Sequence, residues 1–442
     1  MAKPIVAVVG RPNVGKSTFF NKIAGRRISI VEDTPGVTRD RIYADAEWLG
    51  HEFVLIDTGG IEFAPDDVIL EQMRIQSQIA IDTADVILFM VDVREGITAT
   101  DHEVADILRK TRKPVLLVCN KADTRILEED MYDFYNLGLG SPIPISSQQQ
   151  LGLGDLLDKV VERFPPNKDR EDDGDAIKVA ILGKPNVGKS SLVNRLLGEE
   201  RVIVSDRPGT TRDAIDTPFT VGDREYVLID TAGIRRKSRI SHNIERYSVI
   251  RALTAVTRSD VSILVIDACE GPTEQDTKIA GYIQDEGKGC IVLVNKWDLV
   301  DKDNRTLEEY RKNIRNKLAF IDYAPVMFVS AKTGQRVNSI LDMVDRVSGQ
   351  AALRVSTGVL NDIIGEATLM NQPPSDKGKR LKIYYGTQFA VKPPTFALFV
   401  NDKKLMHFSY LRYMENQLRD AFGFEGTPIR IIVRERERKG GV

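Results

Sequence analysis

The chain has 442 residues, of which 42% are hydrophobic and 29% are charged, and its formal net charge is -2. This length and composition allow several buried cores and exclude both a disordered chain and a small disulfide-stapled domain. The small net charge excludes a polyanion-binding field over the whole molecule. The chain shows no signal-peptide pattern and no run of 18 apolar residues. We therefore expect a cytoplasmic protein with no membrane-spanning helix.

Charge and cysteine are unevenly distributed along the chain. Residues 351–442 carry 15 basic and 9 acidic side chains, whereas the first 350 residues carry 47 basic and 55 acidic ones. The three cysteines form no CxxC pair, and Cys119 and Cys290 lie in or beside apolar runs. We expect these two thiols to be buried, in a reducing compartment.

In chain order, the first predicted domain spans residues 1–164. Apolar runs alternate there with stretches of helical periodicity, and these runs lie at 5–9, 53–57, 86–92 and 114–120. Continuous apolar strands separated by helices are typical of a parallel sheet that is covered on both faces. Residues 165–176 follow with an acidic cluster and almost no apolar side chain, which predicts a linker.

The second predicted domain, residues 177–350, repeats the first. Four segments recur in the same order, namely 5–25 as 178–198, 33–41 as 206–214, 54–61 as 227–234, and 119–123 as 294–298. The offset is 173 residues between Gly10 and Gly183, and it grows to 175 between Asn120 and Asn295. A duplicated domain with insertions in its surface loops explains this drift.

The remaining region, residues 351–442, has a different pattern. It predicts an α-β-β-α-β module with a three-stranded sheet, with elements at 352–367, 379–388, 395–402, 409–422 and 428–437.

The glycine-rich segments GRPNVGKS (10–17) and GKPNVGKS (183–190) each follow an apolar strand and open a helical pattern. Glycines let consecutive main-chain amides surround phosphates, and the helix N-terminus favours negative charge. A glycine turn that merely starts a helix is the alternative. Two copies in register with other repeated motifs make that alternative untenable.

Each P-loop supplies a lysine and a serine for triphosphate chemistry. Lys16 and Lys189 are predicted to neutralise the β- and γ-phosphate oxygens, and the hydroxyls of Ser17 and Ser190 to ligate Mg²⁺.

The motifs NKAD (120–123) and NKWD (295–298) select the base. After a buried strand, their aspartates can accept hydrogen bonds from N1–H and the exocyclic amine of guanine, a donor pair that adenine lacks. Ser330, Ala331 and Lys332 suit a main-chain contact to the guanine oxygen. The counterpart at 146–148 is less regular, so the same role is left open there.

DTGG (57–60) and DTAG (230–233) end apolar strands. Their aspartates are predicted to hold Mg²⁺ through water, and Gly60 and Gly233 to sense the γ-phosphate. Thr38 and Thr211 have the spacing of switch threonines that close over Mg²⁺. The next residues are Ile61 and Ile234, which cannot orient a water molecule as a glutamine would.

These motifs define the predicted site residues. The predicted catalytic residues are Lys16, Lys189, Thr38 and Thr211. The predicted Mg²⁺ ligands are Ser17, Thr38, Asp57, Ser190, Thr211 and Asp230. The predicted nucleotide-binding residues are Gly10, Arg11, Pro12, Asn13, Val14, Gly15, Lys16, Ser17, Asp57, Thr58, Gly59, Gly60, Ile61, Asn120, Lys121, Ala122, Asp123, Gly183, Lys184, Pro185, Asn186, Val187, Gly188, Lys189, Ser190, Asp230, Thr231, Ala232, Gly233, Ile234, Asn295, Lys296, Trp297, Asp298, Ser330, Ala331 and Lys332.

The P-loops resemble those of GTPases that hydrolyse with a potassium ion held in part by an asparagine, a position that Asn13 and Asn186 occupy. The alternative is that these asparagines only shape the loop. The doubled motifs together with a small basic module resemble the bacterial EngA (Der) family over nearly the whole chain. This resemblance implies two P-loop NTPase (Ras-like G) domains with mostly parallel sheets in tandem, followed by a small α+β KH-like domain at 351–442.

The resemblance further implies a monomeric cytoplasmic GTPase that uses Mg²⁺ and K⁺, converts GTP to GDP, and binds the large ribosomal subunit and its rRNA late in assembly. It implies no membrane and no DNA partner. An RNA-binding KH domain clamps the backbone with a GxxG loop between two helices. Here the GxxG at 423–426 follows the last helix and holds a glutamate, so we expect a helix C-cap instead.

The basic side chains of this module remain a candidate RNA surface. For those in the C-terminal tail, a solvated charged strand is the alternative. The basic residues are Lys377, Lys379, Arg380, Lys382, Arg434, Arg436, Arg438 and Lys439. After the two DxxG motifs, the segment 62–67 is acidic and the segment 235–239 is basic. We hypothesise that the basic one, with Arg235 and Arg236, faces rRNA, and that the acidic one faces the third module.

Two other function classes stay open. A nucleotide-gated scaffold with little hydrolysis is compatible with Ile61 and Ile234. A tRNA-modification GTPase shares the potassium-type P-loop, but this chain has one G domain too many and no further catalytic motif.

Overall fold

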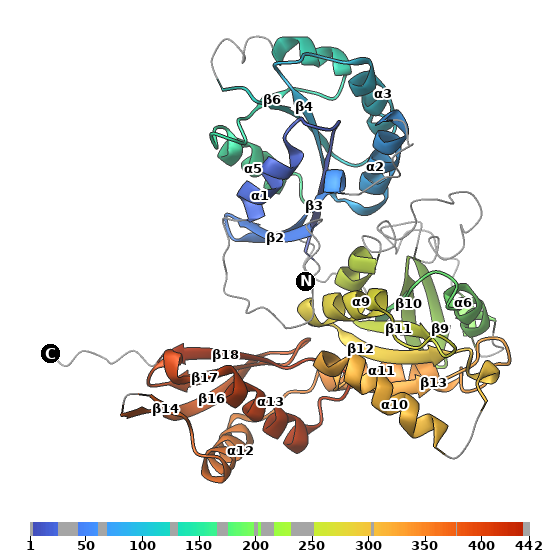
Figure 1. Ribbon diagram of the computed structural model, residues 1–442, viewed down its shortest axis with the longest axis vertical. Helices are drawn as coiled ribbons and strands as arrows, with labels where there is room; N and C mark the ends of the chain where they lie inside the picture. The colour runs from blue at the N-terminus through green and yellow to red at the C-terminus, as the bar shows by residue number, and fades with distance from the viewer. Residues whose placement is uncertain are drawn as a thin grey trace. The chain divides into compact units, whose positions relative to one another are not determined.

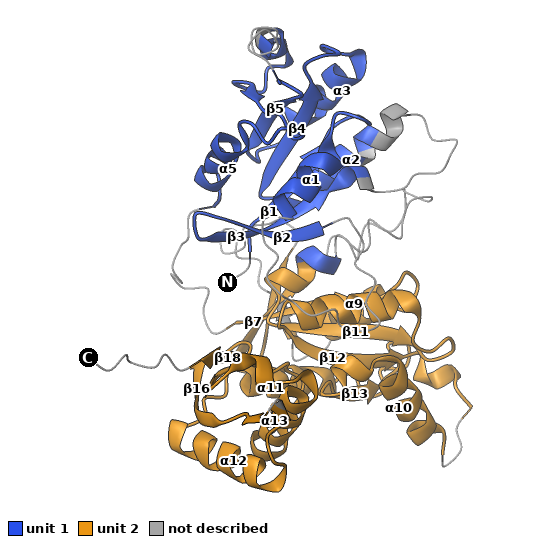
Figure 2. Ribbon diagram, turned by 60° about the vertical axis from the view of Figure 1, so that its left-hand side comes forward, with its two compact units in different colours: residues 1–171, 240–254 blue, residues 172–239, 255–442 orange. Residues whose placement is uncertain are grey.

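The computed structural model describes residues 3–24, 43–60, 69–123, 131–165, 176–198, 202–204, 216–230, 252–301, 305–376 and 378–435. The chain forms two compact units, one of residues 1–171 with 240–254 and the other of 172–239 with 255–442 (Figure 2). The first unit contains the first predicted domain and also residues 240–254 of the second predicted domain. The second unit contains the rest of the second predicted domain together with the C-terminal module.

The first unit is built on a six-stranded sheet in the order β2-β3-β1-β4-β5-β6 (Figure 1). All neighbouring strands pair in parallel except β2 and β3. The strands are β1 (Ile5–Val9), β2 (Tyr43–Trp48), β3 (His51–Asp57), β4 (Val86–Asp92), β5 (Val115–Asn120) and β6 (Ile143–Pro144). The helices are α1 (Lys16–Ala24), η1 (Thr58–Gly60), α2 (Ile69–Thr83), α3 (Ala99–Leu108), η2 (Met131–Leu137) and α5 (Leu153–Glu162).

Strand β1 shows why this sheet needs helices on both faces. Ile5, Ala7 and Val9 belong to a core with residues of α2 and α3, whereas Val6 and Val8 belong to a second core with residues of α1 and α5. Side chains alternate across a strand, so a strand that is apolar at every position buries both of its faces. This confirms the predicted α/β class.

The second unit repeats the arrangement in a seven-stranded sheet, β13-β12-β11-β7-β10-β9-β8. Its strands are β7 (Ile177–Leu182), β8 (Val202–Val204), β9 (Thr217–Val221), β10 (Arg224–Ile229), β11 (Val261–Asp267), β12 (Gly289–Asn295) and β13 (Val326–Phe328). Its helices are α6 (Lys189–Leu197), α9 (Glu274–Asp285), η3 (Trp297–Leu299), α10 (Thr306–Lys317), η4 (Ala319–Ile321) and α11 (Ser339–Ala351). Strands β8 and β9 pair antiparallel at the edge. Cys119 and Cys290 are buried in β5 and β12, as predicted.

The C-terminal module follows α11 in the same unit. Its elements are α12 (Thr357–Met370), β14 (Ser375–Asp376), β15 (Lys379–Arg380), β16 (Ile383–Ala390), β17 (Thr395–Val400), η5 (Lys403–Leu405), α13 (Phe408–Phe422) and β18 (Arg430–Glu435). The sheet order β16-β17-β18 confirms the predicted α-β-β-α-β pattern. The short β14–β15 hairpin was not predicted.

The GxxG segment joins this module to the second nucleotide-domain fold. Gly423 is the C-cap of α13, as expected from sequence. The main chain of Gly426 donates to the carbonyl of Tyr323 at 2.9 Å and accepts from the amide of Cys290 at 2.7 Å. The carboxylate of Glu425 lies 2.8 Å from the guanidinium of Arg346. The segment is therefore part of the junction inside this unit.

We expect Gly426→Ala to weaken this junction. A Cβ at this position would lie 2.3 Å from Cγ2 of Val347, and the backbone φ of +74° is unfavourable for an L side chain. Such overpacking with strain costs about 2 kcal/mol, which lowers the thermal midpoint by roughly 5 °C. Differential scanning calorimetry checks the shift. Val347→Ala removes the two closest atoms, Cγ1 and Cγ2, so the double variant should be more stable than the sum of the two single changes allows. Additive losses would contradict this account.

Candidate functional site

The two P-loops lie at the carboxyl ends of the central parallel strands, between β1 and α1 and between β7 and α6. Gly15 and Gly188 both have a φ of +97°. A Cβ there would lie 2.2 Å from Nδ2 of Asn120 and 2.3 Å from Nδ2 of Asn295, respectively. Only glycine therefore lets the loop pass this close to the NKxD asparagine, which ties the phosphate loop to the base-binding motif.

The lysine of each P-loop donates hydrogen bonds to carbonyls of its own loop, and the pattern is the same in both copies. Nζ of Lys16 donates to the carbonyls of Gly10 at 2.5 Å and Arg11 at 2.8 Å. Nζ of Lys189 donates to the equivalent carbonyls at 2.6 Å and 2.7 Å. Lys16 is only 6% exposed. Burial lowers its pKa to about 8, although the charge of Asp57 opposes the shift.

Two oxygen donors meet beside Lys16. The hydroxyl of Ser17 donates to Oδ2 of Asp57 at 2.9 Å, and Oδ1 of Asp57 accepts from the amide of Gly59 at 2.8 Å. A hydroxyl and a buried carboxylate in contact are the hard ligands that Mg²⁺ prefers, so these residues fit that ion. In the second site, Ser190 follows Lys189 in α6, and Asp230 comes directly after β10.

The NKxD asparagines form the same bridge in both copies. Nδ2 of Asn120 donates to the carbonyl of Val14 at 2.7 Å, and its Oδ1 accepts from the amide of Ser147 at 3.0 Å. In the second copy, Asn295 donates to Val187 at 2.8 Å and accepts from Ala331 at 2.9 Å. The loop at 146–148 therefore takes the same place as Ser330–Lys332, although its sequence is less regular.

The hydroxyl of Ser147 is buried and has no hydrogen-bond partner within the described part of the chain. Buried hydroxyls normally have a hydrogen-bond partner. The hydroxyl of Ser147 lies beside the base-binding motif, so it is suited to bond with the polar edge of a purine base.

Two acidic residues in the sites were missed by sequence reasoning. Nζ of Lys121 donates to Asp92 at 2.5 Å, and Nζ of Lys296 donates to Asp267 at 2.6 Å. Burial raises the pKa of Asp267, but the hydrogen bonds from Lys296 and from the amide of Cys269, together with the charges of Lys296 and Lys184, outweigh burial and lower the pKa. A signal was present, because the apolar runs of β4 and β11 both end in aspartate.

One neighbour of the aspartate differs between the two base-binding motifs. In the first site, Arg94 forms an ion pair with Asp123, whose carboxylate also accepts from Ser146 at 2.5 Å. In the second site, the position equivalent to Arg94 holds Cys269, an exposed thiol. Arg94 therefore competes for the carboxylate that is predicted to read the base, and the second site has no such competitor at this position.

We expect Arg94→Cys to raise guanine-nucleotide affinity at the first site, and Cys269→Arg to lower it at the second. Because the Arg94 side chain is 56% exposed, we expect the effect of an exposed ion pair, a change in Kd of about two- to five-fold. Fluorescent-nucleotide titrations at low and high salt check this, since salt should shrink the difference. Equal affinities for Arg94→Cys and the parent protein would show that the ion pair does not compete with nucleotide.

Asn13 and Asn186 share one unusual backbone feature. Both have a φ of +66° in the left-handed region, which asparagine tolerates better than other residues with a side chain. The backbone conformation is therefore by itself a reason for asparagine at these two positions, apart from any role of the side chain as a ligand.

Several predicted residues lie outside the described part of the chain. They are Thr38, Ile61, Thr211, Thr231, Ala232, Gly233, Ile234, Arg235, Arg236, Lys377, Arg436, Arg438 and Lys439, together with the segment 62–67 and residues 166–175 of the linker.

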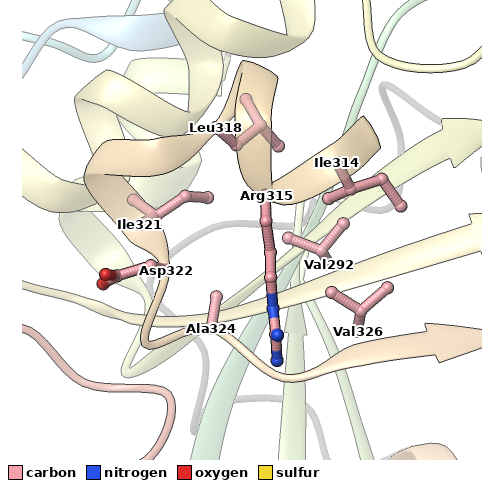
Figure 3. Close-up of a pocket in the computed structure, with 8 residues that line it drawn as sticks. All are labelled: Val292, Ile314, Arg315, Leu318, Ile321, Asp322, Ala324 and Val326. Carbon is pink, nitrogen blue, oxygen red and sulfur yellow. The ribbon is translucent and has the colours of Figure 1, made fainter. Parts of the chain in front are cut away.

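A separate pocket lies in the second unit, lined by residues of β12, α10, η4 and β13 (Figure 3). Arg315 extends beside Val292 and Val326, and most of the remaining lining is apolar. The pocket contains no P-loop residue and offers none of the clustered amides that bind phosphate.

Comparison with known proteins agrees with this geometry. A family model described as "50S ribosome-binding GTPase" matches residues 5–121 and 178–296. A second model, "KH-domain-like of EngA bacterial GTPase enzymes, C-terminal", matches residues 354–434. Among the described residues, no helix has both the length and the apolar character needed to cross a bilayer.

Curated relatives match along nearly their full length. "GTPase Der" of Alkaliphilus oremlandii (strain OhILAs) is 66% identical over 436 residues, which cover 99% of each chain. "GTPase Der" of Acetivibrio thermocellus is 62% identical over 440 residues, which cover 99% of this chain and 100% of the relative. With its two P-loop folds in tandem and its KH-like module, the chain belongs to the Der (EngA) family of bacterial GTPases.

Proposed function

We propose that this protein is a GTP-hydrolysing switch that binds the large ribosomal subunit and acts late in its assembly, as a cytoplasmic monomer. The observations that support this most directly are the matching hydrogen bonds that join the P-loop to the NKxD motif in both copies, and a family match whose description names the 50S ribosome. Two pockets on one chain allow two separate nucleotide signals to act on one partner.

In each pocket the P-loop amides and the lysine bind the β- and γ-phosphates. Lys16 and Lys189 exchange the loop carbonyls that they now contact for phosphate oxygens, which are better acceptors because they are charged. Ser17 with Asp57, and Ser190 with Asp230, would hold Mg²⁺. That ion supplies charge neutralisation across the β- and γ-phosphates when it is bound.

Base selection rests on Asp123 and Asp298. Asn120 and Asn295 fix the main chain on either side of the base, so each aspartate can accept two hydrogen bonds from guanine. We further propose that Thr38 and Thr211 close over the metal in the GTP state and open after hydrolysis, which changes the surfaces that the ribosome meets.

Because isoleucines follow both DxxG motifs, we propose that K⁺ near Asn13 and Asn186 supplies the positive charge that an arginine would otherwise bring. The side-chain amide oxygen of each asparagine would be its ligand. The left-handed backbone requires a residue that tolerates a positive φ, whereas the proposed K⁺ site requires the side-chain amide oxygen.

The variants Asn13→Gly and Asn186→Gly separate these demands. Glycine adopts a φ of +66° freely, so it keeps the loop conformation and removes the side chain with its amide oxygen. If that oxygen binds K⁺, turnover in KCl should fall about ten-fold or more and approach the rate in NaCl, while GDP affinity stays within about two-fold. Steady-state phosphate release in the two salts measures this.

The control is the same pair of positions changed to alanine, which adds backbone strain of about 1 kcal/mol and should also weaken GDP binding. Full potassium stimulation in both glycine variants would assign Asn13 and Asn186 a purely conformational role.

Ribosome co-sedimentation tests the overall proposal. Purified large subunits should carry the protein with a non-hydrolysable GTP analogue more than with GDP, and Lys16→Ala and Lys189→Ala should each reduce this binding. Equal co-sedimentation in every nucleotide state would refute a nucleotide-controlled ribosomal role. A turnover rate of zero in potassium, with binding intact, would instead support the scaffold reading.

A further inference from the structure

The GxxG segment of the C-terminal module is already occupied by protein contacts. Its main chain bonds to Tyr323 and Cys290, Glu425 pairs with Arg346, and a Cβ on Gly426 would collide with Val347. A KH-type clamp needs these amides and this space for an RNA backbone. Any RNA contact by this module must therefore use another surface.

In the part of the chain that the structure describes, helices α12 and α13 pack on one face of the sheet β16-β17-β18, and no helix packs on its other face (Figure 1). Phe396, Leu398 and Val400 of β17 point into the core with residues of α12 and α13. Because side chains alternate along a strand, the intervening residues of β17 lie on the opposite face.

The strand register places an aromatic pair and an arginine in one row on that opposite face. Tyr385 of β16 pairs with Phe399 of β17, and Phe399 pairs with Arg434 of β18. In the next row, Ala397 lies between Thr387 and Ile432. We refer to Tyr385, Phe399, Ile432 and Arg434 as the strand platform.

The platform exposes flat aromatic and apolar surface. The rings of Tyr385 and Phe399 stack with centroids 4.4 Å apart and an interplanar angle of 12°. Tyr385 is 43% exposed and Ile432 is 40% exposed. Two register shifts in β16 place Tyr384 and Phe389 at extra positions, and both side chains are also nearly half exposed. Bulges of this kind redirect side chains next to binding surfaces.

The platform and the chain segment that leads into it carry exposed cations. Lys379, Arg380 and Lys382, which precede β16, are exposed, and Arg434 at the end of the platform row is exposed as well. The nearest acidic residue in sequence, Glu435, accepts a hydrogen bond from the amide of Lys403 at 3.0 Å. Cations beside exposed aromatic faces complement a ligand that carries both phosphates and bases.

We propose that the strand platform binds single-stranded RNA, with unpaired bases stacked on Tyr385 and Phe399 and a phosphate paired with Arg434. Single strands are favoured over duplexes because only an unpaired base can leave its own stack and present its face to a side chain. The inference depends on the proposed ribosomal function only for the natural source of the RNA, an unpaired segment of rRNA.

The test uses the full-length protein and a fluorescein-labelled oligouridylate of 12 nucleotides, followed by fluorescence anisotropy. Tyr385→Leu and Phe399→Leu keep apolar bulk and remove the ring, so each should raise Kd about ten-fold. Arg434→Gln should make the slope of log binding constant against log salt concentration less steep by about 0.7, the value for one phosphate contact on a single strand. A labelled RNA duplex of the same length should bind more weakly than the single strand.

The matched control is Phe408→Leu. Phe408 is an aromatic residue of the same module, 59% exposed at the start of α13, and it lies outside the sheet. Its Kd should equal that of the parent protein. Circular dichroism melts of all variants exclude unfolding as the cause of weaker binding, and Tyr385→Phe should restore binding because it restores the ring.

Unchanged binding by folded Tyr385→Leu, or duplex binding at least as tight as single-strand binding, would overturn the proposal. A photo-crosslinker at position 385 that captures only protein and never the probe would overturn it too, and would assign the face to a protein contact. RNA binding by the strand platform is tested with free RNA, whereas the ribosomal switch is tested by nucleotide-dependent co-sedimentation. Either proposal can therefore fail while the other stands.

Discussion

Asp298→Asn should convert the second site from a guanine site into a xanthine site, with GTP affinity reduced by roughly 1,000-fold or more. A carboxylate accepts from both N1–H and the 2-amino group of guanine. An amide in its place offers one acceptor and one donor, which leaves the guanine amine facing a donor. Xanthine has a carbonyl at that position and therefore suits the amide.

The surrounding structure makes this a clean substitution. The main chain before Asp298 is held by the bond from the Trp297 amide to the carbonyl of Val329 at 3.0 Å. The Trp297 ring is buried and packs against Phe328 with centroids 4.5 Å apart. Asparagine has nearly the same shape as aspartate, so the loop should keep its conformation.

Titration with fluorescent GTP and XTP analogues measures the switch, and Asp123→Asn serves as the counterpart for the first site. In each single variant the unchanged site should still bind one GTP, so calorimetry should count one GTP site and one XTP site per chain. The variants would then show which domain performs most of the turnover. A GTP Kd for the second site within three-fold of the parent value would rule out Asp298 as the base-selecting residue.

Lys16→Met should reduce nucleotide affinity at the first site by about 100-fold, since it removes a charged hydrogen-bond donor to phosphate and keeps the apolar chain. The same lysine should make binding depend on pH. Its pKa is about 8 in the free protein because it is buried. Phosphate oxygens favour the charged form and raise that pKa in the complex, so binding above pH 8 must take up a proton.

The affinity of the first site should therefore fall by up to ten-fold per pH unit above pH 8, until the pKa of the complex is reached. The free protein should respond in the opposite direction. A lysine whose pKa in the folded protein lies below its ordinary value of 10.5 disfavours the folded state while it is protonated. That penalty shrinks as pH rises from 8 towards 10.5.

Calorimetry at pH 8.5 in two buffers with different ionisation enthalpies measures the proton uptake. The Asp298→Asn background confines GTP to the first site. The control is Lys16→Met in that background, studied at high protein concentration, which should show no uptake from this group. Buffer-independent heats for the parent lysine would mean that Lys16 is fully charged before GTP arrives.

The long apolar strands and the doubled motifs could be predicted because their signals are local. A continuous apolar run such as β4 can satisfy both of its faces only inside a covered parallel sheet. The edge strands were harder. Strand β2 reads YADAEW and is partly polar, and β8 and β9 are short antiparallel strands whose pairing depends on their neighbours.

Some site residues could not be found from spacing. Arg94 lies 29 positions before Asp123, and only the parallel pairing of β4 with β5 brings the loops after them together. The same pairing brings Asp92 to Lys121. Thr38 and Thr211 lie outside the described residues, so their role stays a prediction.

By itself, the sequence determined that the chain holds two phosphate loops with two guanine motifs, because each motif is a short segment whose chemistry depends on its own residues and the strand before it. Only the tertiary structure decided that the GxxG segment binds protein, that Arg94 meets Asp123 while Cys269 takes its place in the second site, and that Tyr385, Phe399 and Arg434 share one exposed row. These are contacts between segments far apart in the chain. Their existence depends on strand order and register, which no local pattern encodes.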